Sequence, residues 1–307
     1  MRVAIFTDET GWHTTRLKRA LRARGAEARC VDLADCHFDT TTSSHGIVIP
    51  GYGRALPDAA IVRGIASGSF EQVTKRLGIL HALRECSVPV YNDARGIERS
   101  VDKSMTSFLL HRAGVPTPPA WATESLALAQ RVVMREGAGG RAVVLKPLFG
   151  SQGKDLQRLG HVDGEHVALP PLGGAYADFA YLQRYVPQSS KPGFDWRVLV
   201  VGGRAVAAMR RVSRHWIHNV AQGARCERDE LTPLLAGLAE RAARALELDY
   251  AGIDLVPSDD GGGAAVIEVN GVAAWRGLQR VTDFDIAQAL VDDLLDRRIG
   301  RCLGVVA

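Results

Sequence analysis

The sequence predicts an α/β protein whose C-terminal lobes are of the α+β type, and three observations support that prediction. An apolar run at residues 2–8 is followed by an amphipathic segment at 14–25 and then by further apolar runs, which is the alternation of a parallel sheet with covering helices. From Ala142 the pattern changes to short strands separated by glycine-rich turns. A chain of 307 residues is long enough for two or three such lobes.

The first lobe is expected to span residues 1–93. Its next strands are predicted in "AEARCVDL" (26–33) and "HGIVIPG" (45–51), followed by another helix and strand within 73–93. The glycines of "GYGR" (51–54) do not form GxGxxG and do not open a clear helix. They therefore do not indicate a dinucleotide site.

The second and third lobes are expected at residues 94–186 and 187–307. A helix is predicted from about Ser100 to just before Gly114, after which prolines prevent its continuation. Further along, the pattern predicts strands at 142–146, 180–186, 195–211, 251–258 and 264–270 and a helix at 230–248. The composition of "SDDGGGA" (258–264) indicates a hairpin turn.

Composition and charge exclude several classes of protein. The net charge of +4 is small and its basic residues are dispersed, which argues against a nucleic-acid-binding surface. Five cysteines without CxxC spacing indicate a reduced, intracellular chain without a zinc site. The N-terminus lacks a signal peptide's apolar region, and no apolar run approaches the roughly 18–20 residues of a membrane helix. We therefore expect a cytoplasmic protein.

The segment "LKPLFGSQGKD" (145–155) has the composition of a phosphate-binding loop. Lys146 ends a predicted strand, and Gly150, Ser151 and Gly153 follow in the loop. Glycines allow backbone N–H groups to approach phosphate oxygens, and a lysine adds a positive charge. The order differs from GxxxxGK[ST], however, and a flexible hairpin with a surface lysine is an equally good interpretation of this segment alone.

Two neighbouring strands carry oxygen-bearing side chains. Asp254 lies within "GIDLV", and Glu268 and Asn270 lie two residues apart at the end of "AAVIEVN". Because a short glycine turn joins the strands, we expect an antiparallel pair with these side chains adjacent. Carboxylate and amide oxygens suit Mg²⁺ or Mn²⁺ shared with substrate phosphates. The alternative is two acids hydrogen-bonded to neighbouring backbone groups.

Taken together and in order, these motifs resemble the ATP-grasp carboxylate–amine ligases, and in particular the RimK-like glutamate ligases. The resemblance rests on "DK" (102–103), "VVLKPLFGSQGKD", "LQRYV" (182–186), "DWRVLVVGGRAVAAMRR" (195–211), "GIDLV" and "IEVNG". It covers roughly residues 92–295, whereas the first lobe is similar only in general type. The resemblance implies an ATP-grasp fold preceded by a Rossmann-like pre-ATP-grasp domain, with ATP bound between two lobes.

The resemblance also implies roles for individual residues. Lys103 and Lys146 correspond to two nucleotide-binding lysines, although Lys103 could be a solvated helix residue. The cofactor site for ATP would further comprise a lid of Gly150, Ser151, Gln152 and Gly153, a hinge of Gln183, Tyr185 and Val186 that meets adenine, and Asp195 near the ribose. The alternative for Tyr185 and Val186 is that they are simply core residues. Asp254, Glu268 and Asn270 correspond to ligands of Mg²⁺ or Mn²⁺.

The arginines and the last loop complete the predicted site. The resemblance places Arg197 and Arg210 at the phosphate or acyl phosphate as catalytic residues, and Arg211 and Asn219 at the substrate. In the loop "GVAAWRGLQR", which departs from the commonest family pattern, Trp275 and Arg276 are candidates for an acceptor pocket, with Trp275 in the core as the alternative. His215 and His218 are left without a role.

The function that the resemblance implies is ATP-dependent amide-bond formation through an acyl phosphate. Its substrates would be a small-molecule carboxylate and an amine, glutamate being one of them, and the loop at 273–279 is similar to that of ligases for methanopterin- or methanofuran-type one-carbon carriers. A ligase acting on a peptide or protein C-terminus and a non-catalytic ATP-binding protein are the alternatives. We expect no nucleic-acid or membrane partner, and assembly into a homodimer or homotetramer.

Overall fold

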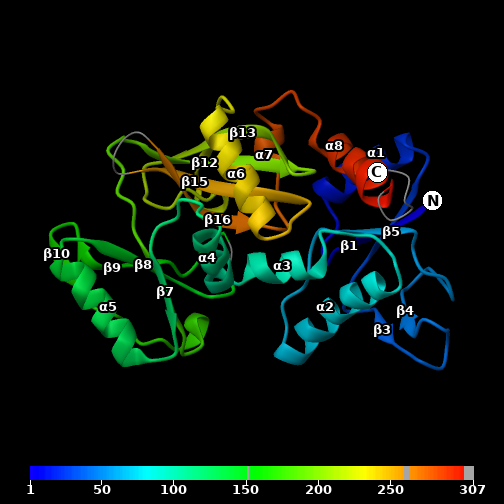
Figure 1. The fold of residues 1–307 in the computed structure, drawn as a ribbon, viewed down its shortest axis with the longest axis horizontal. Helices are drawn as coiled ribbons and strands as arrows, with labels where there is room; N and C mark the ends of the chain where they lie inside the picture. The colour runs from blue at the N-terminus through cyan, green and yellow to red at the C-terminus, as the bar shows by residue number, and fades with distance from the viewer. Residues whose placement is uncertain (151, 259–262, 301–307) are drawn as a thin grey trace.

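The computed structural model describes residues 1–150, 152–258 and 263–300, and these residues form three lobes around three main sheets (Figure 1). Ser151, most of the predicted turn at 258–264 and Cys302 lie outside the described residues. Among the helices that the structure describes, none combines the length and apolar character needed to cross a membrane.

The first lobe is a parallel sheet covered by helices, as predicted. Its strands lie in the order β2-β1-β5-β6, and all three pairings are parallel. Its elements are β1 (Arg2–Phe6), α1 (Trp12–Ala23), β2 (Glu27–Val31), β3 (His37–Phe38), β4 (Ile47–Val48), β5 (Ala59–Val62), α2 (Phe70–Glu85) and β6 (Val90–Tyr91).

One predicted strand of this lobe lies outside the parallel sheet, and one strand of the sheet was not predicted. The segment 45–51 contributes only β4, which pairs antiparallel with β3 outside the main sheet. The strand beside β1 is instead β5, whose four side chains are all buried. A short, wholly apolar strand of this kind shows no alternation, so its periodicity does not separate it from the surrounding loops.

The second lobe has an antiparallel sheet with the order β10-β9-β8-β11-β7. Helix α4 begins at Lys103, where the Asp102 side chain accepts hydrogen bonds from two backbone N–H groups of the first turn, and it ends before Gly114 as predicted. The elements are α3 (Ala94–Val101), α4 (Lys103–Arg112), β7 (Ala120–Thr123), α5 (Leu126–Ala138), β8 (Ala142–Lys146), β9 (Gln157–Val162), β10 (Glu165–Val167), η1 (Gly174–Tyr176) and β11 (Ala180–Arg184).

The third lobe has an antiparallel sheet with the order β14-β13-β12-β15-β16. Helix α6 packs its apolar face on one side of this sheet. The other side carries charged side chains and also apolar ones such as Leu199 and Met209, which join the core shared with the first lobe. The elements are β12 (Gly193–Val201), β13 (Arg204–Ser213), η2 (Val220–Gln222), β14 (Arg225–Arg228), α6 (Pro233–Ala245), β15 (Tyr250–Pro257), β16 (Ala264–Asn270), α7 (Arg276–Gln279), α8 (Ile286–Asp292) and the π-helix η3 (Asp293–Ile299).

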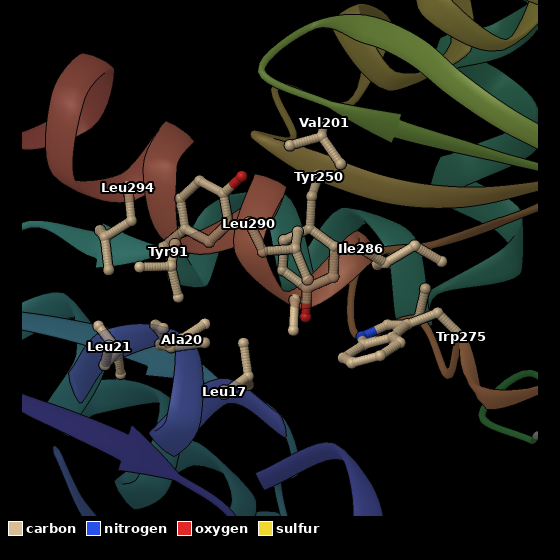
Figure 2. Packing of buried hydrophobic residues seen from close by; sticks show 14 of the residues in the cluster. Leu17, Ala20, Leu21, Tyr91, Val201, Tyr250, Trp275, Ile286, Leu290 and Leu294 are labelled. Carbon is tan, nitrogen blue, oxygen red and sulfur yellow. The ribbon is translucent and has the colours of Figure 1, made fainter. Parts of the chain in front are cut away.

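The first and third lobes share a core. Tyr91 stacks on Tyr250 with ring centroids 5.3 Å apart, and Leu17 of α1 packs with Ile286 of α8 in the same apolar cluster (Figure 2). The fully buried Asn92 side chain donates to the carbonyls of Tyr250 and Gly271, both at 2.6 Å. The chain just after β6 of the first lobe is therefore fixed against β15 and the end of β16 in the third lobe.

Candidate active site

A row of charged side chains crosses the face of the third-lobe sheet opposite α6. Arg211 of β13 lies opposite Asp195 of β12, Arg197 of β12 lies opposite Asp254 of β15, and Asp254 lies opposite Glu268 of β16. Directly opposed residues in an antiparallel pair point to the same face. The adjacency that the sequence predicted for Asp254 and Glu268 is therefore confirmed.

Two β-bulges set this register. Val200 pairs with Ala205 but Leu199 pairs with Ala207, so β13 has one extra residue there. Leu255 pairs with Val266 but Asp254 pairs with Glu268, so β16 also has one extra residue. A bulge advances one strand by one position and changes which side chains meet. The charged row depends on both bulges.

The arginines and acids of this row form a buried ionic cluster. Arg197 holds both carboxylate oxygens of Asp254, the Nη2 contact being 2.9 Å. Arg211 donates to the two oxygens of Asp195 at 2.7 and 2.5 Å and lies 2.9 Å from Asp254. Burial opposes ionisation of Asp254, but the two guanidinium groups outweigh it and keep its pKa below the usual range. Burial raises the pKa of Asp195, which Arg211 only partly offsets.

The structure corrects the prediction for Arg210. Arg210 lies opposite Trp196, so its side chain is on the other face of the sheet, with its guanidinium over Phe194 and its Nε 3.3 Å from Asp229. The arginine in the cluster is its neighbour Arg211, which is 4% exposed. Asp195, expected near the ribose, has both carboxylate oxygens bound by Arg211.

The residues predicted to bind a metal present a suitable set of oxygens. Asn270 lies two residues from Glu268 on the same face, and its Nδ2 donates to the carbonyl of Gly252 at 3.3 Å, which leaves its amide oxygen available. In residues 1–150, 152–258 and 263–300 no group of three His, Cys, Asp or Glu side chains could hold an ion without other donors. Two carboxylates and an amide nevertheless fit Mg²⁺, which commonly takes its remaining ligands from phosphates and water.

Two lysines from the second lobe face this row. Lys146, at the end of β8, donates to the side chain of Gln183 at 2.7 Å. Burial lowers the pKa of Lys146 to about 8, opposed by Glu268, while nearby Lys103 acts in the same direction as burial. Lys103 donates to the backbone carbonyl of Gly150 at 2.7 Å, and burial lowers its pKa, opposed by Glu268. Lys103 is therefore directed into the site and is not a solvated helix residue.

The predicted lid lies against the third lobe. Gly153 has φ +71°, and a Cβ there would lie 2.6 Å from Oδ1 of Asn219 and 2.8 Å from Cγ2 of Ile217. The carbonyl of Gln152 accepts a hydrogen bond from Gln222 at 3.3 Å. Together with the contact between Lys103 and Gly150, these interactions connect the lid to both sides of the site. Ser151 lies outside the described residues.

A cavity of about 100 Å³ lies between the second and third lobes and brings nine of the nineteen predicted site residues together. Its lining comprises Val144, Lys146, Leu156, Gln183, Arg184, Tyr185, Val186, Gln188, Asp195, Arg211, Trp216, Ile217, His218, Asn219, Asp254, Val256, Ile267 and Glu268. One space is therefore surrounded by the hinge residues Tyr185 and Val186, by Lys146 and by all members of the charged row except Arg197.

No role was predicted from the sequence for Trp216 and His218, which line this cavity, or for Arg158, which packs against its lining. Arg158 places its guanidinium over the rings of Tyr185 and Trp216, at 5.4 and 5.5 Å from their centroids, and so packs against two residues that line the cavity. His218 is buried, and burial together with Arg211 lowers its pKa to about 4. It is therefore neutral near pH 7. The segment "SRHWIHN" (213–219) is rich in aromatic and imidazole rings, but the sequence does not indicate which of these rings points into the cavity.

Trp275 does not form the predicted aromatic platform. It is 1% exposed and lies in the shared core of the first and third lobes (Figure 2). There it packs edge-on against Trp12 and His13. The alternative position, beneath the loop, is therefore the one observed. Arg276 is exposed and lines a separate cavity beside the first lobe.

Known proteins resemble this chain along its whole length. A family model for the RimK PreATP-grasp domain matches residues 1–97, and one for the RimK-like ATP-grasp domain matches residues 100–294. The tetrahydromethanopterin:alpha-L-glutamate ligase of Methanococcus maripaludis is 33% identical over 96% of this chain and 98% of its own. A probable alpha-L-glutamate ligase of Maridesulfovibrio salexigens is 28% identical over 95% of this chain and 94% of its own.

Solved structures show the same fold. The ATP-grasp ligase PsnB, complexed with a minimal precursor, has a TM-score of 0.72 at 24% identity, covering 95% of this chain and 97% of its own. A RimK domain ATP-grasp protein from Sphaerobacter thermophilus has a TM-score of 0.67 at 21% identity, covering 96% of this chain and 100% of its own. The predicted ATP-grasp fold with an N-terminal pre-ATP-grasp domain is confirmed.

Proposed function

The chain belongs to the RimK-like ATP-grasp family and is an ATP-dependent carboxylate–amine ligase, and we propose that it joins the amine of L-glutamate to a carboxylate of a tetrahydromethanopterin-type one-carbon carrier. The observation that carries the proposal is that Asp195, Arg211, Asp254 and Glu268 of the charged row surround one cavity together with Lys146. Arg197 lies next to this cavity and holds Asp254. The choice of substrates is supported by three tetrahydromethanopterin:alpha-L-glutamate ligases that are 30% to 34% identical to this chain over at least 78% of it.

In the proposed reaction, a carboxylate oxygen of the acceptor forms a bond to the γ-phosphorus of ATP while the bond to ADP breaks. The nitrogen of glutamate then attacks the acyl carbon, phosphate leaves with the C–O bond electrons, and the nitrogen loses a proton to phosphate or water. Lys103, Lys146, Arg197 and Arg211 serve this reaction by neutralising phosphate charge and fixing the reactants. Such chemistry requires no nucleophilic side chain.

Asp254, Glu268 and Asn270 would hold Mg²⁺, which supplies further neutralisation of phosphate charge when bound. In the structure both oxygens of Asp254 contact arginines. We infer that Asp254 exchanges an arginine contact for the ion, which would make guanidinium N–H groups available to a phosphate. Arg197 and Arg211 would then be the phosphate-binding arginines.

The test is ADP and phosphate release from Mg²⁺–ATP with L-glutamate, measured with and without a tetrahydromethanopterin-type acid, with peptides as alternative carboxylates. Hydroxylamine traps any acyl phosphate. Release that requires both L-glutamate and the pterin acid, with an adduct one glutamate heavier by mass spectrometry, is the expected result. Release with a peptide but not with the pterin would refute the proposed acceptor. Tight binding of ATP with no release for any pair would contradict the proposed reaction with these substrates.

A cytoplasmic location and assembly into a dimer or tetramer are part of the proposal. The cysteines among the described residues, Cys30, Cys36, Cys86 and Cys226, are all free thiols, which is compatible with a reducing compartment. Light scattering at several protein concentrations would measure the assembly.

A further inference from the structure

A second cavity, of about 270 Å³, lies between the first lobe and the loop that follows β16. Its walls are residues 7–14, which follow β1, together with Arg63, which follows β5, and Arg276. It therefore lies outside the carboxyl ends of two adjacent parallel strands, the edge at which open α/β sheets generally bind ligands. None of these residues was assigned to the nucleotide site, and Arg276 alone was predicted to contact a substrate.

The cavity carries charges of both signs that do not neutralise one another. Its lining includes Arg63 and Arg276 and the exposed acids Asp8 and Glu9. Within the parts of the chain that the structure describes, none of these four side chains takes part in a salt bridge. Elsewhere on this interface arginines are paired, as Arg24 is with Asp296 at 2.6 Å. Unpaired charges lining a concave site are the groups expected to orient a charged ligand.

The Arg63 guanidinium is held by two hydrogen bonds, but not all of its N–H groups have a partner. Its Nη1 donates to the Tyr250 hydroxyl at 2.9 Å and to the carbonyl of Ala273 at 2.8 Å. Its Nε is buried and has no hydrogen-bond partner in the described structure. A buried, unpaired guanidinium N–H costs free energy, which an anionic ligand would recover. The guanidinium is thus fixed in direction and retains donors.

His13, which also lines this cavity, does not contribute a third positive charge. Burial lowers its pKa to about 4, helped by Arg63 and Arg276, and its Nε2 accepts a hydrogen bond from the backbone N–H of Trp275 at 3.2 Å. On the acidic side, Gly64 leaves the space that the Asp8 carboxylate occupies, since a Cβ there would lie 2.1 Å from Oδ1 of Asp8. The cavity lining therefore contains two arginines and two carboxylic acids, and its histidine is uncharged near pH 7.

One loop separates this cavity from the charged row. Ala273 accepts from Arg63 on the cavity side, and the next carbonyl, that of Ala274, accepts from Arg197 at 3.4 Å on the other side. Arg197 in turn holds Asp254. A ligand in the cavity would therefore lie one loop away from the carboxylates that would hold the metal.

We propose that this cavity binds the amino-acid substrate, L-glutamate, with Arg63 and Arg276 holding its two carboxylates and Asp8 or Glu9 its ammonium group. The inference rests on the proposed function, which requires a site for glutamate. The volume corresponds to about nine water molecules at about 30 Å³ each, similar to the ten non-hydrogen atoms of glutamate. The arrangement selects a zwitterion with a second acidic group over neutral amino acids.

The experiment is calorimetric titration of L-glutamate into the protein saturated with Mg²⁺ and a non-hydrolysable ATP analogue. Arg276→Gln is expected to raise the Kd for L-glutamate at least about tenfold, the loss of one charge-assisted contact. Arg63→Lys keeps the positive charge but loses the planar guanidinium with its several N–H donors, and it is also expected to raise the Kd for L-glutamate. Asp8→Asn should weaken L-glutamate but not glutarate, which lacks the amine. Arg22→Gln, an exposed residue of α1, is the matched control.

The outcomes separate this inference from the proposed function. If the wild-type protein does not bind L-glutamate, or if Arg276→Gln and Arg63→Lys bind it with wild-type affinity, the cavity is not the glutamate site. ADP release that depends on glutamate, with an unchanged KM in Arg276→Gln, would refute the site and leave the ligase intact. Arginine-dependent glutamate binding without ADP release for any acceptor would support the site and contradict the proposed reaction.

Discussion

Arg211 lies directly opposite Asp195 across β13 and β12, and its guanidinium reaches both oxygens of that carboxylate at 2.7 and 2.5 Å. This pairing exists because of the bulge near Val206. The pairs nearest the hairpin turn, Val201 with Arg204 and Val200 with Ala205, would place Arg210 opposite Asp195 if they continued without interruption. The extra residue moves β13 by one position, so that Arg211 faces the site and Arg210 faces away.

We predict that Arg211→Lys and Arg210→Lys differ sharply in activity although they are the same change at adjacent positions. A lysine at 211 cannot bridge Asp195 and Asp254, whereas Arg210 is 40% exposed on the other face of the sheet. Turnover should fall by about 10- to 100-fold for Arg211→Lys. It should change by no more than about twofold for Arg210→Lys. Equal loss in both variants, measured by steady-state ADP release, would contradict the assignment of faces.

Replacing Glu268 should remove Mg²⁺-dependent turnover and leave the fold intact. Glu268→Gln keeps the size of the side chain and loses the charge next to Asp254. We expect turnover to fall at least about 100-fold and the Mg²⁺ concentration for half-maximal rate to rise, with little change in Tm because Glu268 is only half-buried. Glu165→Gln, an exposed change on β10, is the control. Full activity of Glu268→Gln would exclude the metal role.

Local patterns predicted the parts of the site that depend on one hairpin. The pairing of Asp254 with Glu268 follows from two strands joined by a glycine turn, and the structure confirms it. The face of the sheet on which Arg210 and Arg211 lie could not be predicted, because one bulged residue reverses the alternation of side chains along β13. The sequence "GGRAVAAMRR" does not show where that bulge is. Motif order predicted the fold well, since six ordered motifs constrain the chain over about two hundred residues.

Contacts between lobes were beyond prediction for a different reason. The burial of Trp275 depends on Trp12, which is more than two hundred and sixty positions earlier in the chain. The cavity at Arg63 is likewise built from the first lobe and the loop after β16. Neither could be found by reading one segment, because periodicity reports which face of an element is buried and not which element covers it.

The lid should be sensitive to a single methyl group at Gly153. Alanine there would combine φ +71° with a contact 2.6 Å from Asn219, so the lid would have to move away from the third lobe. We expect KM for ATP to rise by about tenfold in Gly153→Ala. Gly25→Ala has nearly the same φ, +70°, with no atom within 4 Å, and it should lose stability without a kinetic effect. If both variants change KM equally, backbone strain explains the result and the lid contact does not.

Nucleotide affinity should depend on pH through Lys146. Burial places the pKa of its ammonium group at about 8, with Glu268 opposing and Lys103 reinforcing the shift. Below that pH the free protein already carries the charge that a phosphate needs, so the Kd for an ATP analogue should be constant. Above it the lysine is neutral and must take up a proton on binding, so the Kd should rise by up to about tenfold per pH unit. Lys146→Arg stays charged, so its Kd should not show this rise in fluorescence titrations between about pH 7 and about pH 9.5. A flat wild-type profile would show that Lys146 keeps its proton throughout.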